Sequence, residues 1–215
     1  MKERILVTGG TGYIGSHTVV ELQNSGYDVV IVDNLSNSSA DVVDNIEKVS
    51  GIRPAFEKLD CLDLEGMDKL FTKYPGIKGI IHFAASKAVG ESVQKPLLYY
   101  RNNLVSLINL LELNAETWSR RYYFFHHQCT VYGQPDVLPV TEEAPIKKAE
   151  SPYGNTKQIN EEIIRDTVAS GSPINAIMLR YFNPIGAHPT ALIGELPNGV
   201  PQTVTLRYSD SNGYS

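Results

Sequence analysis

The sequence contains few cysteines, no cluster of basic residues and no long apolar run. Its two cysteines, Cys61 and Cys129, lack the spacing of metal ligands, so we expect two thiols rather than a zinc site or a disulfide framework. A formal net charge of -5 without a basic cluster argues against nucleic acid as a partner. No apolar stretch approaches the roughly 20 residues needed to span a bilayer, which argues against a membrane partner.

The length of 215 residues allows one large domain, or one domain and part of a second. The first four residues lead directly into an apolar segment, so the sequence predicts no secretory signal peptide. These observations together predict a cytoplasmic protein.

A glycine-rich segment, residues 8–15, follows the apolar run 5–7 and precedes a segment with helical apolar periodicity. Gly10, Gly12 and Gly15 have the spacing in which one glycine makes a tight strand-to-helix turn, one lets a pyrophosphate approach the backbone, and one lets the helix pack on the strand. A phosphate there would meet free N–H groups and the positive end of the helix dipole. The alternative interpretation is an ordinary surface turn.

A second apolar run, residues 29–32, ends at Asp33, roughly 20 residues after the glycine-rich segment, where a carboxylate can accept hydrogen bonds from an adenosine ribose. The pattern therefore predicts a strand–helix–strand unit that binds NAD. The alternative is that Asp33 only begins the turn 33–37.

Further patterns predict strands over 54–59, 79–85, 122–125 and 174–180, and helices over 41–49, 64–74 and from Pro96 onward. Residues just beyond the carboxyl ends of parallel strands face the ligand crevice. Asp60 is therefore a candidate contact to adenine or ribose, with a helix N-cap as the alternative.

Small side chains follow the segment 79–83, and they would let a flat cofactor lie against the backbone at Ala84, Ala85 and Ser86. Lys87 would reach a phosphate or a sugar hydroxyl, or is a solvated lysine. Asn102 and Asn103 lie on the helix that starts at Pro96, and we expect them to face either solvent or the cofactor.

Residues 151–157 have the pattern of a helix start, with Ser151 placed to cap it and Pro152 at its first position. Tyr153 and Lys157 are four residues apart and so share a helix face. An ammonium beside a phenol favours the phenolate and lowers its pKa from about 10, which suits a general base. His126 and His127, being adjacent on a strand, point to opposite faces, and a metal site there is disfavoured.

With these motifs taken together, the sequence resembles the extended short-chain dehydrogenase/reductases. The resemblance is carried by residues 8–15, 33–35, 82–85, 130–133, 151–157 and 180–184. Two longer strings, 88–92 and 183–189, resemble the UDP-glucose 4-epimerases within that family. The likeness covers nearly all of residues 1–202.

The resemblance implies an α/β fold, a Rossmann-type doubly wound parallel sheet, with the family's smaller C-terminal substrate domain largely missing. In domain terms it implies an NAD-binding domain over 1–180, the start of a substrate domain over 181–202 and an aberrant tail over 203–215.

The resemblance also implies an isomerase that uses tightly bound NAD to interconvert UDP-glucose and UDP-galactose through a 4-keto sugar. Tyr153 would take the proton of the sugar 4-hydroxyl, and Lys157 would hold the nicotinamide ribose. The implied cofactor contacts are Gly9, Gly10, Gly12, Tyr13, Ile14, Gly15, Asp33, Asn34, Leu35, Ser36, Asn37, Ser38, Asp60, Cys61, Phe83, Ala84, Ala85, Ser86, Lys87, Asn102, Tyr153, Lys157 and Phe182. The implied contacts to the UDP-sugar partner are Lys87, Tyr153, Tyr181 and Asn183. A homodimer is implied for the full-length family.

The sequence departs from the family pattern in two places. Gln128 stands where the family carries a serine or threonine, and a glutamine amide donates a hydrogen bond but does not shuttle a proton as a hydroxyl does. The family also continues past Pro201 into a domain that closes over UDP. Permissible codons for 114–124 and 208–215, read in shifted frames, yield family-like sequence, so we hypothesise local frameshifts.

Three functions follow from this sequence. The first is a UDP-glucose 4-epimerase by descent, whose activity in this chain is in question because of Gln128 and the missing domain. The second is another nucleotide-sugar 4-epimerase or a dehydratase. The third is an inactive NAD-binding fragment.

Overall fold

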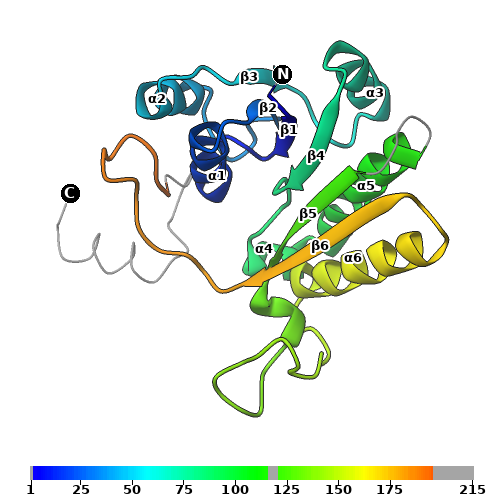
Figure 1. Ribbon diagram of the computed structural model, residues 1–215. Coiled ribbons are helices and arrows are strands. Elements are labelled where there is room, and N and C mark those ends of the chain that lie inside the picture. The colour runs from blue at the N-terminus through cyan, green and yellow to red at the C-terminus, as the bar shows by residue number, and fades with distance from the viewer. Residues whose placement is uncertain (1, 116–120, 196–215) are drawn as a thin grey trace.

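The computed structural model describes residues 2–115 and 121–195, with side chains for residues 2–113 and 130–195. These residues form one six-stranded parallel sheet in the order β3-β2-β1-β4-β5-β6, with helices on both faces (Figure 1). The predicted doubly wound α/β sheet is therefore confirmed. Among the described residues, no helix has the length and apolar character that a membrane crossing requires.

The elements alternate along the chain as a parallel sheet requires. In order they are β1 (Arg4–Thr8), α1 (Tyr13–Asn24), β2 (Asp28–Asp33), α2 (Asp41–Ser50), β3 (Ala55–Lys58), α3 (Leu64–Lys73), β4 (Ile77–His82), α4 (Val89–Gln94), α5 (Pro96–Ala115), β5 (Arg121–Gln128), the 3-10 helix η1 (Cys129–Tyr132), α6 (Pro152–Ala169) and β6 (Ile174–Tyr181).

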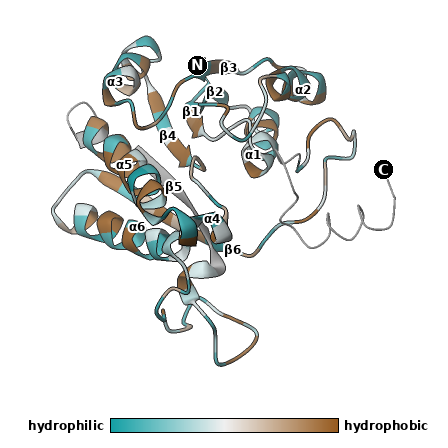
Figure 2. Ribbon diagram, turned by 180° about the vertical axis from the view of Figure 1, so that it is seen from behind, coloured by the Kyte–Doolittle hydropathy of each residue, from teal (hydrophilic) through white to brown (hydrophobic). Residues whose placement is uncertain are grey.

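Alternation along the strands divides the core into two layers. Leu6 and Val30 pack with side chains of α3, α5 and α6, whereas Ile5 and Val29 pack with side chains of α1 and α2. Both faces of the sheet are thus apolar, which explains why the strands read as continuous apolar runs. Figure 2 shows both hydrophobic and hydrophilic segments along α5, whose buried side chains include the apolar Leu107 and Leu110 and the polar Asn103 and Ser106.

The strand order reverses at β1, which pairs with β2 on one side and with β4 on the other. Loops leaving the carboxyl ends of β1 and β4 therefore diverge to opposite faces of the sheet. In open α/β sheets this topological switch point is where ligands bind. The predicted glycine-rich segment and the small residues after β4 both lie at this place.

Two of the predicted helix starts can be compared with the capping contacts. Ser151 caps α6 as predicted, since its Oγ accepts a hydrogen bond from the Gly154 N–H at 3.1 Å. The N-cap of α3 is Asp63, whose Oδ1 accepts from the Gly66 N–H at 3.0 Å, so the capping alternative for Asp60 was wrong. The predicted strand 79–85 ends at His82, because the chain there leaves the sheet for the crevice.

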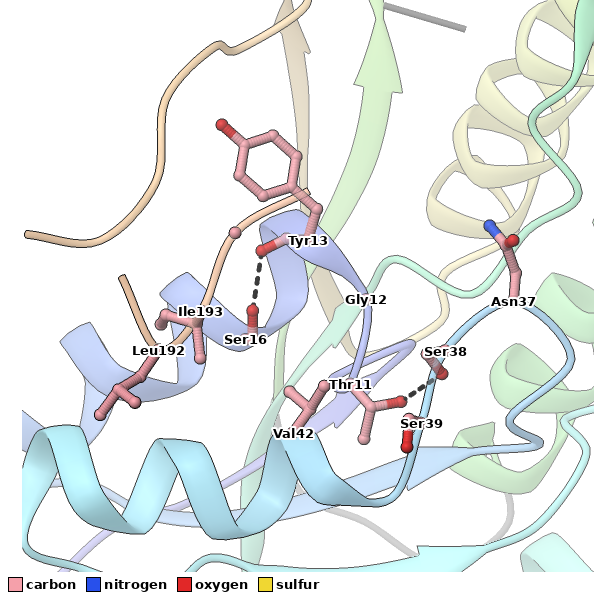
Figure 3. Close-up of a pocket in the computed structure, with 11 residues that line it drawn as sticks. Thr11, Gly12, Tyr13, Ser16, Asn37, Ser38, Ser39, Val42, Leu192 and Ile193 are labelled. Carbon is pink, nitrogen blue, oxygen red and sulfur yellow. Dashed lines mark hydrogen bonds between the residues drawn. The ribbon is translucent and has the colours of Figure 1, made fainter. Parts of the chain in front are cut away.

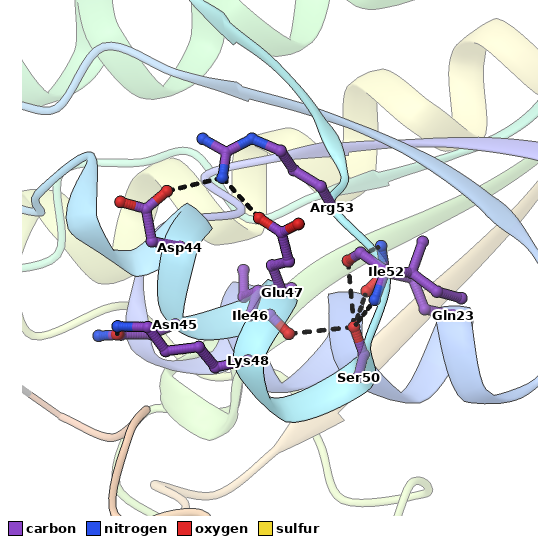
Figure 4. A network of polar contacts seen from close by, with 9 residues as sticks. All are labelled: Gln23, Asp44, Asn45, Ile46, Glu47, Lys48, Ser50, Ile52 and Arg53. Atoms are coloured by element: carbon purple, nitrogen blue, oxygen red, sulfur yellow. Dashed lines mark hydrogen bonds and ion pairs between the residues drawn. The ribbon is translucent and has the colours of Figure 1, made fainter.

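A polar network ties the end of α2 to α1 and to the chain entering β3 (Figure 4). Ser50 Oγ donates to Gln23 Oε1 at 2.7 Å, and Gln23 Nε2 donates to the carbonyl of Ile52 at 3.1 Å. Arg53 pairs with Asp44 and Glu47 on the exposed side, where ion pairs contribute about 0–1 kcal/mol. The network fixes the C-terminal end of α2 against the C-terminal end of α1.

Candidate functional site

The glycine-rich turn joins β1 to α1 with little room for side chains. A Cβ on Gly15 would lie 2.2 Å from the carbonyl oxygen of Gly9, and Gly9 itself has φ +69 and faces the backbone of Ala84. Gly12 is the N-cap of α1 and offers no side chain to the first N–H groups of the helix. The turn therefore brings a helix N-terminus, with its positive dipole end, to the crevice.

The sequence left two interpretations of Asp33 open, a carboxylate that binds ribose and a residue that begins a turn, and the structure is compatible with both. Its Oδ1 accepts hydrogen bonds from the Leu35 N–H at 2.9 Å and from Ser38 Oγ at 3.2 Å, so it organises the turn after β2. Its Oδ2 accepts from the Thr11 N–H at 3.2 Å, which joins that turn to the glycine-rich turn. Asp33 also lines the cavity described next.

A cavity of about 650 Å³ lies at the switch point, within the ~300–1,000 Å³ typical of small-molecule sites. Most predicted cofactor residues line it, together with the predicted substrate residue Asn183. They are Gly9, Gly12, Tyr13, Ile14, Gly15, Asp33, Asn34, Ser36, Asn37, Ser38, Asp60, Cys61, Phe83, Ala84, Ala85, Ser86, Lys87 and Asn102. The predicted site residues outside this lining are Gly10, Leu35, Tyr153, Lys157, Tyr181 and Phe182.

A smaller recess of about 150 Å³ adjoins the glycine-rich turn (Figure 3). Hydroxyl groups of Thr11, Ser16 and Ser38 line one side, and Leu192 and Ile193 line the other. Thr11 Oγ1 is hydrogen-bonded to Ser38 Oγ at 2.7 Å. The recess shows that the segment after β6 returns to the start of α1.

We refer to residues 183–195 as the return segment. Tyr13 donates its phenolic hydrogen to the carbonyl of Gly186 at 2.6 Å, and Ile193 is buried against the core of α1 and α2. Glu195 lies 3.8 Å from the Lys87 ammonium, measured between Oε1 and Nζ. The return segment thus crosses the cavity mouth and is attached on both sides of it.

The turn after β3 forms the next part of the cavity wall. Asp60 Oδ2 accepts from Asn34 Nδ2 at 2.9 Å, and Oδ1 accepts from the Leu62 N–H at 2.9 Å. Cys61 is a free, buried thiol whose pKa is raised to about 12, chiefly by burial and further by the charges of Asp60 and Asp33. Cys61 therefore acts as a small apolar side chain of the wall.

The two asparagines of α5 have different surroundings. Asn102 lines the cavity and donates to Ser86 Oγ at 3.0 Å. Asn103 is 1% exposed and faces neither solvent nor the cavity, which corrects our expectation for it. Its side chain accepts from the Ser86 N–H at 2.8 Å and donates to Thr156 Oγ1 at 3.1 Å, so it ties the turn after β4 to α6.

Tyr153 and Lys157 lie close together on α6, as their spacing predicts. Tyr153 is 1% exposed, Lys157 is 4% exposed, and the Lys157 Nζ lies 5.6 Å from the centre of the Tyr153 ring. Burial lowers the pKa of Lys157 to about 8. The ring of Tyr99, which lines the cavity, packs edge-on against Tyr153 with 6.4 Å between ring centres, so Tyr153 is one ring away from the cavity.

His82, at the end of β4, lies in the same buried region. Its Nδ1 is hydrogen-bonded to Thr8 Oγ1 at 2.7 Å. Its pKa is lowered to about 3, first by burial and second by the charge of Lys157. His82 is therefore neutral at physiological pH and adds no second positive charge beside Lys157.

A buried ion pair holds α6 against β6. Glu161 accepts hydrogen bonds from Arg180 Nε at 2.7 Å and from Arg165 Nη2 at 2.5 Å. Arg180 also donates to the Tyr132 hydroxyl at 3.1 Å, and its pKa is raised, chiefly by Glu161. This network connects α6, β6 and η1, and so fixes the helix that carries Tyr153 and Lys157.

Two sequence-predicted features lie wholly or partly outside the described residues. Gln128 pairs with Tyr181 in the register of β5 and β6, but its side chain, like those of His126 and His127, lies outside the described residues. Phe182 is exposed. The last part of the predicted substrate-domain start and the whole predicted tail, residues 196–215, also lie outside the description.

Sequence reasoning missed several residues of the cavity wall, namely Val32, Leu59, Ala88, Val89, Glu91, Tyr99, Ser106, Pro184 and Glu195. One of them carried a usable signal. Ser106 follows Asn102 by four residues and so shares its helix face. Glu195 and the other distant residues carried none, because only the tertiary fold brings them to the cavity.

Residues 5–206 match the model of a family described as the NAD dependent epimerase/dehydratase family. The UDP-glucose 4-epimerase of Bacillus subtilis is 48% identical over 200 residues, which cover 93% of this chain and 58% of that relative. UDP-glucose 4-epimerase 2 of Arabidopsis thaliana is 48% identical over 207 residues, again covering 58% of the relative. The chain thus spans less than two thirds of these relatives.

Solved structures give the same result for the fold. The chain is similar to the UDP-glucose 4-epimerase of Bifidobacterium longum, solved in complex with NAD+ and UDP, with a TM-score of 0.92 and 41% identity over 99% of this chain and 63% of that one. The enzyme of Stenotrophomonas maltophila, solved with NAD and a formylated UDP-arabinopyranose, gives a TM-score of 0.91 at 42% identity, covering 98% of this chain and 62% of that one.

Proposed function

The chain belongs to the NAD dependent epimerase/dehydratase family, and from this premise we propose that it binds NAD in the cavity at the switch point and forms the nucleotide-binding part of a UDP-glucose 4-epimerase. One observation carries the proposal. The cavity brings the N-terminus of α1, the carboxylate of Asp33 and the wall next to Tyr153 into one space at the carboxyl edge of the sheet.

The residues present fit a dinucleotide in size and chemistry. A side chain at Gly15 would collide with the backbone, so glycine keeps this turn free of a side chain. A pyrophosphate can then approach the N–H groups of α1. Asp33 offers a carboxylate for ribose hydroxyls, and Asp60 and Cys61 flank the place beyond it. We propose that the adenosine lies there and that the nicotinamide end lies toward Ser86, Asn102 and Tyr99.

NAD, when bound, supplies a hydride acceptor and donor at the sugar C4. In the proposal, Tyr153 takes and returns the proton of the 4-hydroxyl group, and the Tyr99 ring that separates it from the cavity in this structure moves aside when the sugar binds. Lys157, close to the phenol, favours its ionised form by charge, which is how a neighbouring ammonium assists a general base. Glu161 and Arg180 hold the helix that carries both residues.

Substrate and activity belong to the proposal alone, because the chain spans 58% of its curated relatives. We propose residues 1–180 as the NAD-binding domain and 181–202 as the start of a UDP-sugar domain, with Lys87, Tyr181 and Asn183 as substrate contacts. A cytoplasmic location and a homodimer are part of the same proposal. Another nucleotide-sugar 4-epimerase or a dehydratase, and an inactive NAD-binding fragment, are the competing functions.

The experiment uses the purified chain. Bound nucleotide is extracted and identified by chromatography, added NAD is titrated by calorimetry, and the turnover of UDP-galactose is then followed. NAD binding with turnover supports the full proposal, and binding without turnover supports the fragment. A chain that neither retains nor takes up NAD would contradict the proposal.

A further inference from the structure

Ser106 is a buried residue of the cavity wall with an unusual hydroxyl group. It lies on α5, is 3% exposed and lines the cavity. Its Oγ has no hydrogen-bond partner among the described residues. Buried hydroxyl groups are nearly always hydrogen-bonded, and an unpaired one destabilises the fold. A group of this kind in a cavity wall points to a ligand atom as its partner.

The position of Ser106 in a helix makes the missing bond informative. A helical serine or threonine can donate to a backbone carbonyl of the preceding turn. Thr18 in α1 does so, with its Oγ1 donating to the carbonyl of Ile14 at 2.9 Å. Ser92 in α4 is also fully buried, and its Oγ donates to the carbonyl of Val89 at 2.6 Å. Ser106 forgoes this local bond.

Neighbouring contacts on α5 locate Ser106 along the cavity. One turn earlier, Asn102 donates to Ser86 Oγ at 3.0 Å, in the turn after β4. Three residues later, Asn109 Nδ2 donates to the carbonyl of Cys61 at 2.9 Å, in the turn after β3. Ser106 therefore lies between these two turns, and the turn after β3 is beside the ribose-binding carboxylate of Asp33.

We propose that the Ser106 hydroxyl hydrogen-bonds the adenine ring of the dinucleotide, which the turn after β3 places next to α5. Adenine presents ring nitrogens that accept and an exocyclic amino group that donates, and a serine hydroxyl can serve either. Ser106 is then an adenine-binding residue of the cavity. The inference rests on NAD binding in the cavity as proposed above.

The test compares S106A with S92A, a matched removal of a hydroxyl that already has an internal partner. Calorimetry measures the affinity for ADP-ribose, which contains the adenosine, and for nicotinamide mononucleotide, which lacks it. S106A should weaken ADP-ribose and NAD about fivefold, which corresponds to ~1 kcal/mol for one neutral hydrogen bond. Its affinity for nicotinamide mononucleotide should equal that of the wild type. S92A should change none of the three affinities.

The melting temperature of the ligand-free protein is a second readout, and the two variants should change it in different directions. S106A should melt at the wild-type temperature or above it, because an unpaired buried hydroxyl is lost, whereas S92A should melt lower. If the wild type binds NAD and S106A binds ADP-ribose equally well, the Ser106 assignment is wrong and the proposed function stands. If the wild type binds neither NAD nor ADP-ribose, the Ser106 assignment and the proposed function are both wrong.

Discussion

The Lys157 ammonium lies 5.6 Å from the centre of the Tyr153 ring, and both side chains are almost fully buried on α6. Burial lowers the pKa of Lys157 to about 8. The folded protein therefore holds a buried positive charge near the Tyr153 ring at a cost in stability.

Lys157→Met should stabilise the ligand-free protein at pH 7. The lowered pKa corresponds to about 3 kcal/mol of differential cost for the buried ammonium, and methionine removes it. Denaturant unfolding of wild type and variant measures the difference. Lys69→Met, at an exposed position on α3, is the control and should change the free energy of unfolding little.

The pH dependence of that difference has a definite sign. Lys157 loses its proton at about pH 8 in the folded protein, and near 10.4 in the unfolded chain. Between these values the unfolded state binds more protons, so the wild type gains stability as pH rises. The advantage of the variant should be full below pH 8 and should shrink toward pH 10. An advantage independent of pH would contradict this account.

The sequence predicted those parts of the fold that depend on local patterns. Apolar runs such as 29–32 became buried strands, and Ser151 caps α6 as expected. The glycine spacing predicted a cramped turn, and the Gly15 contact explains it sterically. Asp33 organises the turn after β2 with one carboxylate oxygen, as one interpretation predicted. Its other oxygen joins that turn to the glycine-rich turn.

The predictions from sequence were wrong or incomplete where a tertiary contact decides the position of a residue. The sequence offered Asp60 as a possible cap for α3, but Asp63 caps that helix, and a hydrogen bond from Asn34, distant in sequence, holds Asp60 at the cavity. Asn103 was expected to face either solvent or the cofactor, yet its side chain is buried and hydrogen-bonds Ser86 and Thr156. The placement of Glu195 opposite Lys87 needs the whole return segment, which carries no periodic pattern.

Gly15→Ala should remove NAD binding and destabilise the protein by several kcal/mol. The new Cβ would lie 2.2 Å from a backbone oxygen, so α1 must move away from β1 and its N-terminus would leave the cavity. Gly90→Ala is the matched control, because its Cβ would meet nothing within 4 Å. On helix propensity that variant should gain about 0.5–1 kcal/mol. Thermal melting and NAD titration check both, and a G15A protein with normal NAD affinity would contradict the steric role.

Asp60→Asn and Asp63→Ala should separate ligand binding from helix capping. Asp63→Ala removes the α3 cap and should cost about 1 kcal/mol of stability without changing NAD affinity. Asp60→Asn changes the charge of the cavity wall and should weaken NAD binding more than it lowers stability. Unfolding and calorimetry on the two variants give the comparison. The reverse pattern would restore Asp60 as the cap.

Glu195→Gln should speed the release of NAD from the proposed site. Glu195 and Lys87 face each other across the cavity mouth at 3.8 Å, and the Lys87 side chain is half exposed, so the pair contributes little to folding. The prediction takes the return segment to open when a ligand leaves, which breaks this weak attraction. A pair of ~0.2–1 kcal/mol corresponds to an increase of up to about fivefold in the dissociation rate. Stopped-flow displacement of NAD by excess ADP-ribose measures that rate. Glu65→Gln, which removes an exposed pair with Lys69 on α3, is the control and should leave it unchanged. An unaltered rate in E195Q would mean that the return segment does not limit NAD release through this contact, and its attachment at Tyr13 and Ile193 would be the next to test.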